Sequence, residues 1–79
     1  MASGKEILER YYLEMRWRCL SLAADLDRVE RGEGGAELLR TDPRMQRLQQ
    51  AFDVLKSNTP GRAEQVQSIF TDKTPPPAR

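Results

Sequence analysis

The feature that most constrains the fold is an uninterrupted stretch of helix-forming residues that spans residues 5–31. It contains neither proline nor glycine and is rich in Leu, Glu, Arg, Met and Ala, which are good helix formers. Ser3 and Glu6 match the Ser-x-x-Glu capping box at its start, and Gly32 supplies a C-terminal stop. The sequence therefore predicts one long helix, roughly 40 Å in length.

Two apolar stripes run along this helix. The longer stripe, which we call the seam, steps by four and three residues in the manner of a heptad repeat and consists of Leu8, Tyr12, Met15, Cys19, Leu22, Leu26 and Val29. The shorter one, which we call the Trp17 stripe, follows the same spacing on nearly the opposite side and consists of Leu13, Trp17, Leu20 and Ala24. A helix that is apolar on two sides needs cover on both.

Two shorter helices are predicted after a glycine-rich connection over residues 32–41, in which Leu38 and Leu39 are expected to dock and a short helical turn is expected to form. Asp42-Pro43 combines an N-cap with proline at the first helical position and predicts a helix over about residues 43–57. Thr59-Pro60 repeats that signal and predicts a third helix over residues 60–70. The residues expected to face inward are Met45, Leu48, Phe52 and Leu55 on the first, and Ala63, Val66, Ile69 and Phe70 on the second.

The length of 79 residues leaves room for one domain. We expect an all-α fold over residues 1–71, with the long N-terminal helix packed against a short two-helix hairpin in a three-helix bundle-like arrangement. The proline-rich residues 72–79 lack apolar anchors and are expected to form a disordered tail.

The charge of the chain is nearly balanced, with 13 Lys and Arg against 12 Asp and Glu and a net of +1. This balance provides no overall field that would attract nucleic acid or an anionic membrane. A signal peptide and a membrane-spanning run are not evident, so a cytoplasmic protein is expected.

No catalytic, cofactor-binding or metal-binding residues are predicted, and the chain is not expected to be an enzyme. It contains no histidine, and its single thiol, Cys19, is expected to act as a small buried hydrophobe in the seam. Acidic residues at the end of the long helix match no calcium loop. We expect surface ion pairs between residues spaced four positions apart along the helix, which is a favourable spacing. The two expected pairs are Asp27 with Arg31 and Glu6 with Arg10.

The two short helices also suggest an alternative function, a helix-turn-helix-like DNA-binding regulator. Base edges would be read by Gln65, Gln67 and Ser68, and phosphates would be contacted by Arg40, Arg44, Arg47 and Arg62. DNA-binding domains usually carry a stronger basic stripe than this chain does. Nucleic acid is therefore an unfavoured partner that the sequence leaves open.

The favoured function is a protein–protein interaction or assembly module. Because only two or three residues join the short helices, they are expected to lie side by side and to cover one face of the long helix. The predicted partner-binding residues on the other face are Leu13, Trp17, Leu20 and Ala24, with Tyr11 and Arg16 at the rim. The simplest partner is a second copy of the chain, which would make a homodimer; the alternative is a monomeric bundle with Trp17 half exposed.

Three segments resemble small bacterial all-helical proteins of unknown function. They are Ile-Leu-Glu-Arg-Tyr-Tyr-Leu-Glu-Met-Arg at residues 7–16, Ala-Ala-Asp-Leu-Asp-Arg at residues 23–28 and Arg-Ala-Glu-Gln-Val-Gln-Ser-Ile-Phe at residues 62–70. The resemblance spans most of the chain. It implies an all-helical fold and brings no activity, cofactor or site residue with it.

Overall fold

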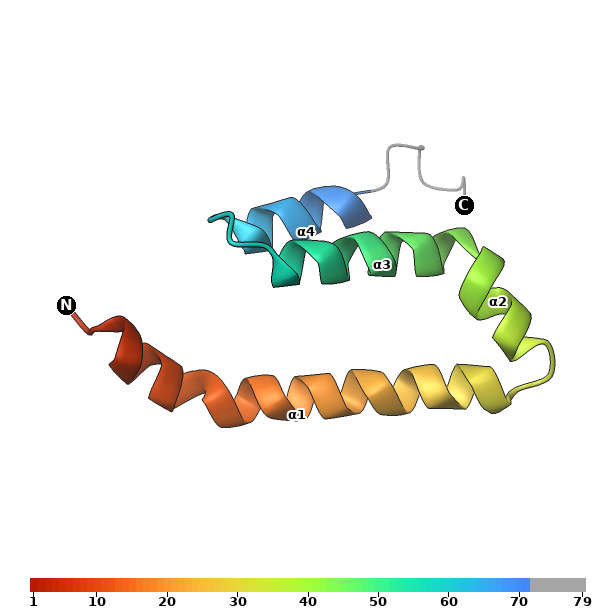
Figure 1. The fold of residues 1–79 in the computed structure, drawn as a ribbon, viewed down its shortest axis with the longest axis horizontal. Coiled ribbons are helices and arrows are strands. Elements are labelled where there is room, and N and C mark those ends of the chain that lie inside the picture. Colours follow the sequence, from red (N-terminus) through yellow and green to blue (C-terminus); the bar gives the residue numbers. More distant parts are fainter. Residues whose placement is uncertain (72–79) are drawn as a thin grey trace, which may run out of the picture. The chain divides into compact units, whose positions relative to one another are not determined.

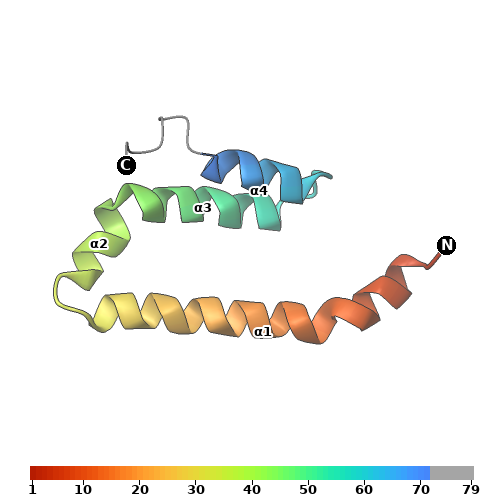
Figure 2. The ribbon, with the colours of Figure 1, turned by 180° about the vertical axis from the view of Figure 1, so that it is seen from behind.

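The computed structural model describes residues 1–71, and every regular element among them is an α-helix (Figures 1 and 2). The predicted all-helical class is confirmed. The chain divides into two compact units, residues 1–36 and residues 37–79. The tail predicted for residues 72–79 lies outside the described residues.

Helix α1 (Gly4–Arg31) is 28 residues long and is held at both ends by the predicted capping residues. The Ser3 hydroxyl oxygen accepts a hydrogen bond from the backbone N–H of Glu6 at 3.2 Å and donates one to the Glu6 carboxylate at 3.4 Å. At the other end, the Gly32 N–H donates to the Val29 carbonyl at 3.1 Å. These caps satisfy backbone groups that a helix end would otherwise leave without partners.

The chain turns after α1 through a glycine segment that leads directly into α2 (Gly35–Thr41). Gly35 is buried against the end of α1, where a Cβ atom would lie 1.6 Å from the Val29 carbonyl oxygen. Its N–H donates to the Gly32 carbonyl at 2.9 Å. The turn is therefore a specific structure that requires glycine, and the connection that the sequence suggested to be flexible contains a seven-residue helix.

Helix α3 (Pro43–Lys56) begins as the Asp-Pro signal predicts, with Asp42 as N-cap and Pro43 in the first turn. It ends at Ser57, whose hydroxyl and N–H both donate to the Val54 carbonyl, at 2.7 and 3.1 Å. Ser57 is thus the C-cap, one position beyond the last helical residue.

Helix α4 (Arg62–Phe70) starts two positions after the Pro60 that was expected to open it. Its N-cap is Gly61, in the left-handed conformation at φ +80°, which only glycine adopts readily. The loop is held by the Gln65 amide, which donates to the Pro60 carbonyl at 3.1 Å, and by the Arg62 guanidinium, which donates to the Ser57 carbonyl at 3.1 Å. Because of these bonds, Pro60 belongs to the turn, and α4 begins only at Arg62.

Helices α3 and α4 pack against each other in the second unit. Ala51 is 5% exposed at this contact and is the one apolar side chain fully buried among the described residues. Six apolar side chains of the same two helices are half-buried: Met45, Leu48, Phe52, Val54, Val66 and Ile69. Leu55 and Phe70, which were expected to face inward, are 58% and 46% exposed, and Ala63 is also exposed. Within this unit each of the two helices can shield only one side of the other.

Candidate interaction surface on helix α1

Helix α1 presents the Trp17 stripe as a strongly exposed apolar face. Trp17 is 67% exposed, Leu13 61% and Leu20 52%, while Ala24 is half-buried. A shallow open depression on this face is lined by Trp17, Leu20, Ser21, Ala24, Asp25 and Arg28. Because α1 runs without a break, its regular turn keeps these side chains on one face.

Tyr11 and Arg16, the two residues predicted to form the rim of this face, lie on different sides of α1. At about 100° per residue, Arg16 points to the flank of the Trp17 stripe, whereas Tyr11 lies close to the seam on the other side of the helix. Both side chains are exposed, Tyr11 at 45%. Helix geometry therefore associates Arg16 with the stripe and separates Tyr11 from it.

The seam shows more varied exposure than the Trp17 stripe. Leu22 and Leu26 are half-buried, while Tyr12 is 55% exposed. Cys19, expected to be buried, is exposed. The expectation for Cys19 was wrong for this structure, in which no residue of α1 is buried among those described. Because α1 is unbroken, the seam residues still share one side of the helix.

Ion pairs along α1 use other partners than the sequence suggested. Arg18 pairs with Glu14 at 2.5 Å, four residues away, and Arg28 pairs with Asp25 at 2.5 Å, three residues away. The expected pairs Glu6 with Arg10 and Asp27 with Arg31 are not among the ion pairs of residues 1–71. The four side chains of the expected pairs, Glu6, Arg10, Asp27 and Arg31, are all exposed to solvent.

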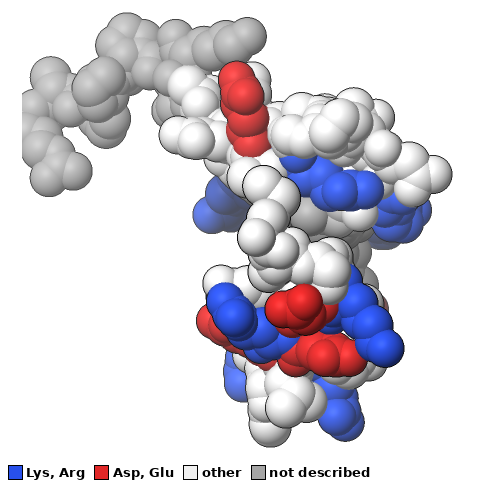
Figure 3. All heavy atoms as spheres, turned by 90° about the vertical axis from the view of Figure 1, so that its left-hand side faces the viewer, with Lys and Arg blue, Asp and Glu red and all other residues white. Residues whose placement is uncertain are grey.

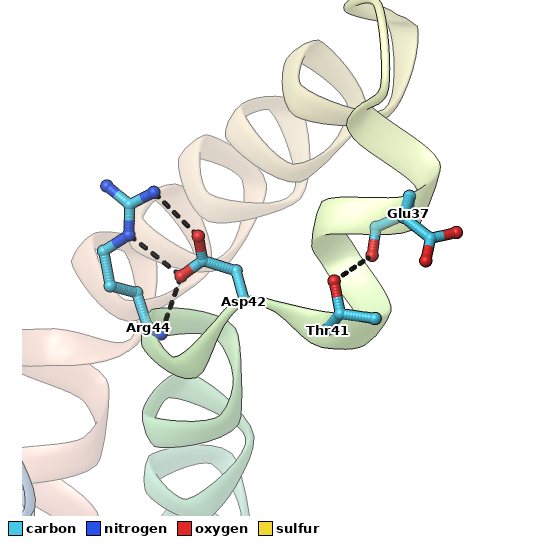
Figure 4. A network of polar contacts seen from close by, with 4 residues as sticks. All are labelled: Glu37, Thr41, Asp42 and Arg44. Atoms are coloured by element: carbon cyan, nitrogen blue, oxygen red, sulfur yellow. Dashed lines mark hydrogen bonds and ion pairs between the residues drawn. The ribbon is translucent and has the colours of Figure 1, made fainter.

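A compact polar network lies at the junction of α2 and α3 (Figure 4). The Asp42 carboxylate accepts from the Arg44 backbone N–H at 2.8 Å and from two guanidinium nitrogens of Arg44, at 2.9 and 2.8 Å. The Arg44 side-chain hydrogen bonds, followed by its backbone N–H, lower the pKa of Asp42 from 3.8 to about 2. Next to it, the Thr41 hydroxyl donates to the Glu37 carbonyl at 2.9 Å. These contacts cap two helix ends and leave Asp42 fully engaged.

Four of the seven side chains proposed to contact DNA are bonded within the chain. Arg40 pairs with Glu37, Arg44 with Asp42, and Arg62 and Gln65 bond backbone carbonyls of the α3–α4 loop. In Figure 3, Lys and Arg side chains intermix with Asp and Glu side chains in the lower part of the view, while in the upper part they lie in separate groups among uncharged residues. The DNA-binding alternative stays a prediction that no contact of the described residues favours.

Within residues 1–71, no group of three or more His, Cys, Asp or Glu side chains is arranged to hold a metal ion. A second shallow depression on α4 is lined by Glu64, Gln67, Ser68 and Thr71, where the Thr71 hydroxyl donates to the Gln67 carbonyl at 2.8 Å. In the same range, no helix combines the length and apolar character needed to cross a membrane.

Comparisons of the chain with protein-family models, with curated proteins and with solved structures found no match.

Proposed function

We propose that this chain is a protein–protein interaction or assembly module that binds a second copy of itself through the Trp17 stripe. The observation that supports the proposal is the exposure of a tryptophan and two leucines in one row on α1. The first unit contains one long helix and the turn that follows it, so it has no second helix that could cover either stripe. Apolar area of this kind gains free energy when another surface removes it from water.

In the proposed arrangement, the hairpin of α3 and α4 packs on the seam of α1, as in the predicted bundle-like fold. Its own exposed apolar side chains, Leu55 and Phe70, give it apolar area to contribute. Since one hairpin of this size covers one side of a helix, the Trp17 stripe is the face left for a partner.

The expected strength of association follows from the area available. Full burial of a large apolar side chain contributes about 1.5–3 kcal/mol of free energy. Each copy contributes three such side chains, Leu13, Trp17 and Leu20, and their gain is reduced because their own helix already shields part of their surface. The gain for a dimer is then on the order of 10 kcal/mol, against an association cost of roughly 4–15 kcal/mol. The proposal therefore predicts a reversible, concentration-dependent dimer.

Sedimentation of the purified chain over a wide concentration range tests this proposal. The wild-type protein should shift from a 9.1 kDa species to twice that mass as concentration rises. Trp17→Ala should remain monomeric at concentrations where wild type is dimeric, because it removes the largest side chain of the stripe. Tyr11→Ala is the matched control, since it removes an exposed aromatic side chain from the other side of α1.

Two results would contradict the proposal. One is a wild-type chain that sediments at 9.1 kDa at every concentration. The other is equal weakening by Trp17→Ala and Tyr11→Ala, which would show that the contact is not confined to the Trp17 stripe.

A further inference from the structure

The Trp17 stripe continues in both directions along α1, and the residues that extend it are charged. The same steps of four and three residues lead outward from the apolar centre to one acidic and one basic residue at each end. In chain order, the extended stripe consists of Glu6, Arg10, Leu13, Trp17, Leu20, Ala24, Asp27 and Arg31. An apolar centre is thus flanked by the same acid-then-base order on each side.

The four terminal charges of this extended stripe are available to a partner. The ion pairs of α1 among the described residues join Glu14 to Arg18 and Asp25 to Arg28, and neither includes a terminal charge of the stripe. The carboxylate of Glu6 has only the 3.4 Å contact with the Ser3 hydroxyl, and all four groups are exposed.

We infer that the second copy lies antiparallel along the extended stripe, with Trp17 opposite Leu20 of the second copy. This inference rests on the proposed function and specifies its geometry. In this register, Leu13 lies opposite Ala24, and the apolar residues of both copies meet in the centre. At the ends, each Arg10 faces an Asp27 and each Glu6 faces an Arg31, so every charged position meets its opposite.

Charge complementarity selects this orientation over a parallel one. A parallel, in-register pair would place Arg10 against Arg10 and Asp27 against Asp27, which makes each end of the contact repulsive. The antiparallel pair converts the same residues into attractive contacts, and twofold symmetry forms each of them twice.

The same residues also fix the register. Sliding one helix by a heptad in one direction places Arg10 opposite Leu20 of the second copy. Sliding it in the other direction places Trp17 opposite Asp27. Either shift sets charge against apolar surface, which costs the charged group its hydration without an ion pair in return.

The flanks of this contact carry one favourable and one unfavourable charge pair. Glu14 comes near Arg28 of the second copy on one flank, and Glu9 comes near Glu30 on the other. Both pairs lie at the solvent-exposed rim, where screening keeps such interactions weak. Specificity therefore comes from the terminal charges in line with the stripe.

Charge reversal tests the orientation. Arg10→Glu should weaken the dimer by about tenfold or more, because it replaces two attractive pairs with two repulsive ones. The double variant Arg10→Glu/Asp27→Lys restores opposite charges across the contact and should recover most of the lost affinity. Arg18→Glu is the matched control, because Arg18 lies on the far side of α1 and should change the dissociation constant little.

Cysteine cross-linking tests the orientation of the two copies directly. It uses chains that carry Cys19→Ser, so that the introduced cysteine is the only thiol. Under mild oxidation, an equimolar mixture of the Leu13→Cys and Ala24→Cys chains should give a disulfide-linked dimer, whereas each chain alone should not. A parallel dimer would instead link Ala24→Cys chains to one another.

The outcomes separate the inference from the proposed function. A wild-type dimer that is unaffected by Arg10→Glu, or that links Ala24→Cys chains to one another, overturns the antiparallel geometry and leaves the interaction module standing. A wild-type chain that remains monomeric throughout overturns both.

Discussion

Replacing Gly35 with alanine should disrupt the turn between α1 and α2. The added Cβ would lie 1.6 Å from the Val29 carbonyl oxygen and 2.7 Å from the Val29 carbonyl carbon. Cβ atoms essentially never approach other heavy atoms closer than 3.0 Å, so a displacement of at least about 1.4 Å is needed (3.0 less 1.6). Both crowded groups belong to the backbone, and no side-chain rotation can provide this displacement.

The size of the effect follows from the hydrogen bonds that such a displacement breaks. The Gly35 N–H to Gly32 carbonyl bond, at 2.9 Å, and the Gly32 N–H to Val29 carbonyl bond, at 3.1 Å, both span the crowded region. Each is worth about 0.5–1.5 kcal/mol, and residual strain adds to their loss, so Gly35→Ala should cost about 2–4 kcal/mol. The cost is limited by the free energy of opening this turn, because the start of α2 can detach from α1 while the rest of the chain keeps its structure.

Hydrogen exchange of backbone amides measures this effect at the turn itself. In Gly35→Ala, the amides of residues 32 and 35 should exchange faster, while those in the middle of α3 should keep their wild-type rates. The neighbouring glycines provide graded controls. At Gly32 the new Cβ would meet its nearest atom at 3.4 Å, an ordinary contact, whereas Gly34→Ala meets no atom but is strained by its φ of +74°. The expected order of destabilisation is Gly35, then Gly34 at about 1–2 kcal/mol, then Gly32 with little effect.

A different order would refute this reasoning. If Gly35→Ala leaves the exchange rates and the denaturation curve unchanged, or if Gly32→Ala costs more than Gly35→Ala, the close approach of Gly35 to Val29 does not hold the turn in place.

Two further predictions concern the second unit. The pKa of Asp42 is lowered from 3.8 to about 2, chiefly by the Arg44 side chain, so its contribution to stability is present above about pH 3.8 and is lost as the pH falls toward 2. Carbon-detected NMR titration should give that low midpoint, and Asp42→Asn should remove this part of the pH dependence of melting; a midpoint near 3.8 would contradict the network in Figure 4. Ala51→Leu should destabilise the α3–α4 contact by about 1–3 kcal/mol in a denaturant melt, since Ala51 is 5% exposed there. The same change at exposed Ala63 should have little effect, and equal costs at the two positions would show that α4 does not pack on Ala51.

The sequence predicted those elements whose signals are local and act together. In α1, a capping box, an uninterrupted run of helix formers and a terminal glycine all indicate the same boundaries, and the helix spans Gly4–Arg31. Asp42-Pro43 likewise marks the start of α3. The two stripes of α1 follow from residue spacing alone, because an unbroken helix converts spacing into direction.

The elements that sequence reasoning missed depend on backbone conformation and on distant contacts. The glycines before α2 suggested flexibility, yet Gly34 adopts a positive φ and Gly35 packs directly on the Val29 carbonyl, which together start a helix. At α4, proline suggested a helix start, but the left-handed Gly61 continues the turn and delays the helix. Composition cannot distinguish a glycine that confers freedom from one that is required by a close contact.

The ion pairs of α1 illustrate a similar limit in the prediction of the candidate site. Arg10 has an acidic residue four positions away on each side, Glu6 and Glu14, and local spacing gives the two similar weight. In the structure, Glu14 pairs with Arg18 instead. Glu6 lies in the first turn and contacts its N-cap residue Ser3, while the Asp25–Arg28 pair forms at the three-residue step. The four charges that extend the Trp17 stripe are among the side chains of α1 that take part in neither of these ion pairs, and helical spacing places them in line with the stripe.

Folding of α1 and the proposed association through it should be coupled. Isolated helices gain little net stability from backbone hydrogen bonds in water, and most helical stability in proteins comes from burying an apolar face. Helix α1 buries no residue among those described, so its helical state depends on whatever covers its stripes. A partner that binds only the helical form stabilises it by mass action, which makes the helix content of α1 rise with protein concentration. Substitutions on the extended stripe, such as Trp17→Ala and Arg10→Glu, should then lower helix content at a given concentration together with the dimer fraction, whereas Tyr11→Ala and Arg18→Glu should lower neither by this route.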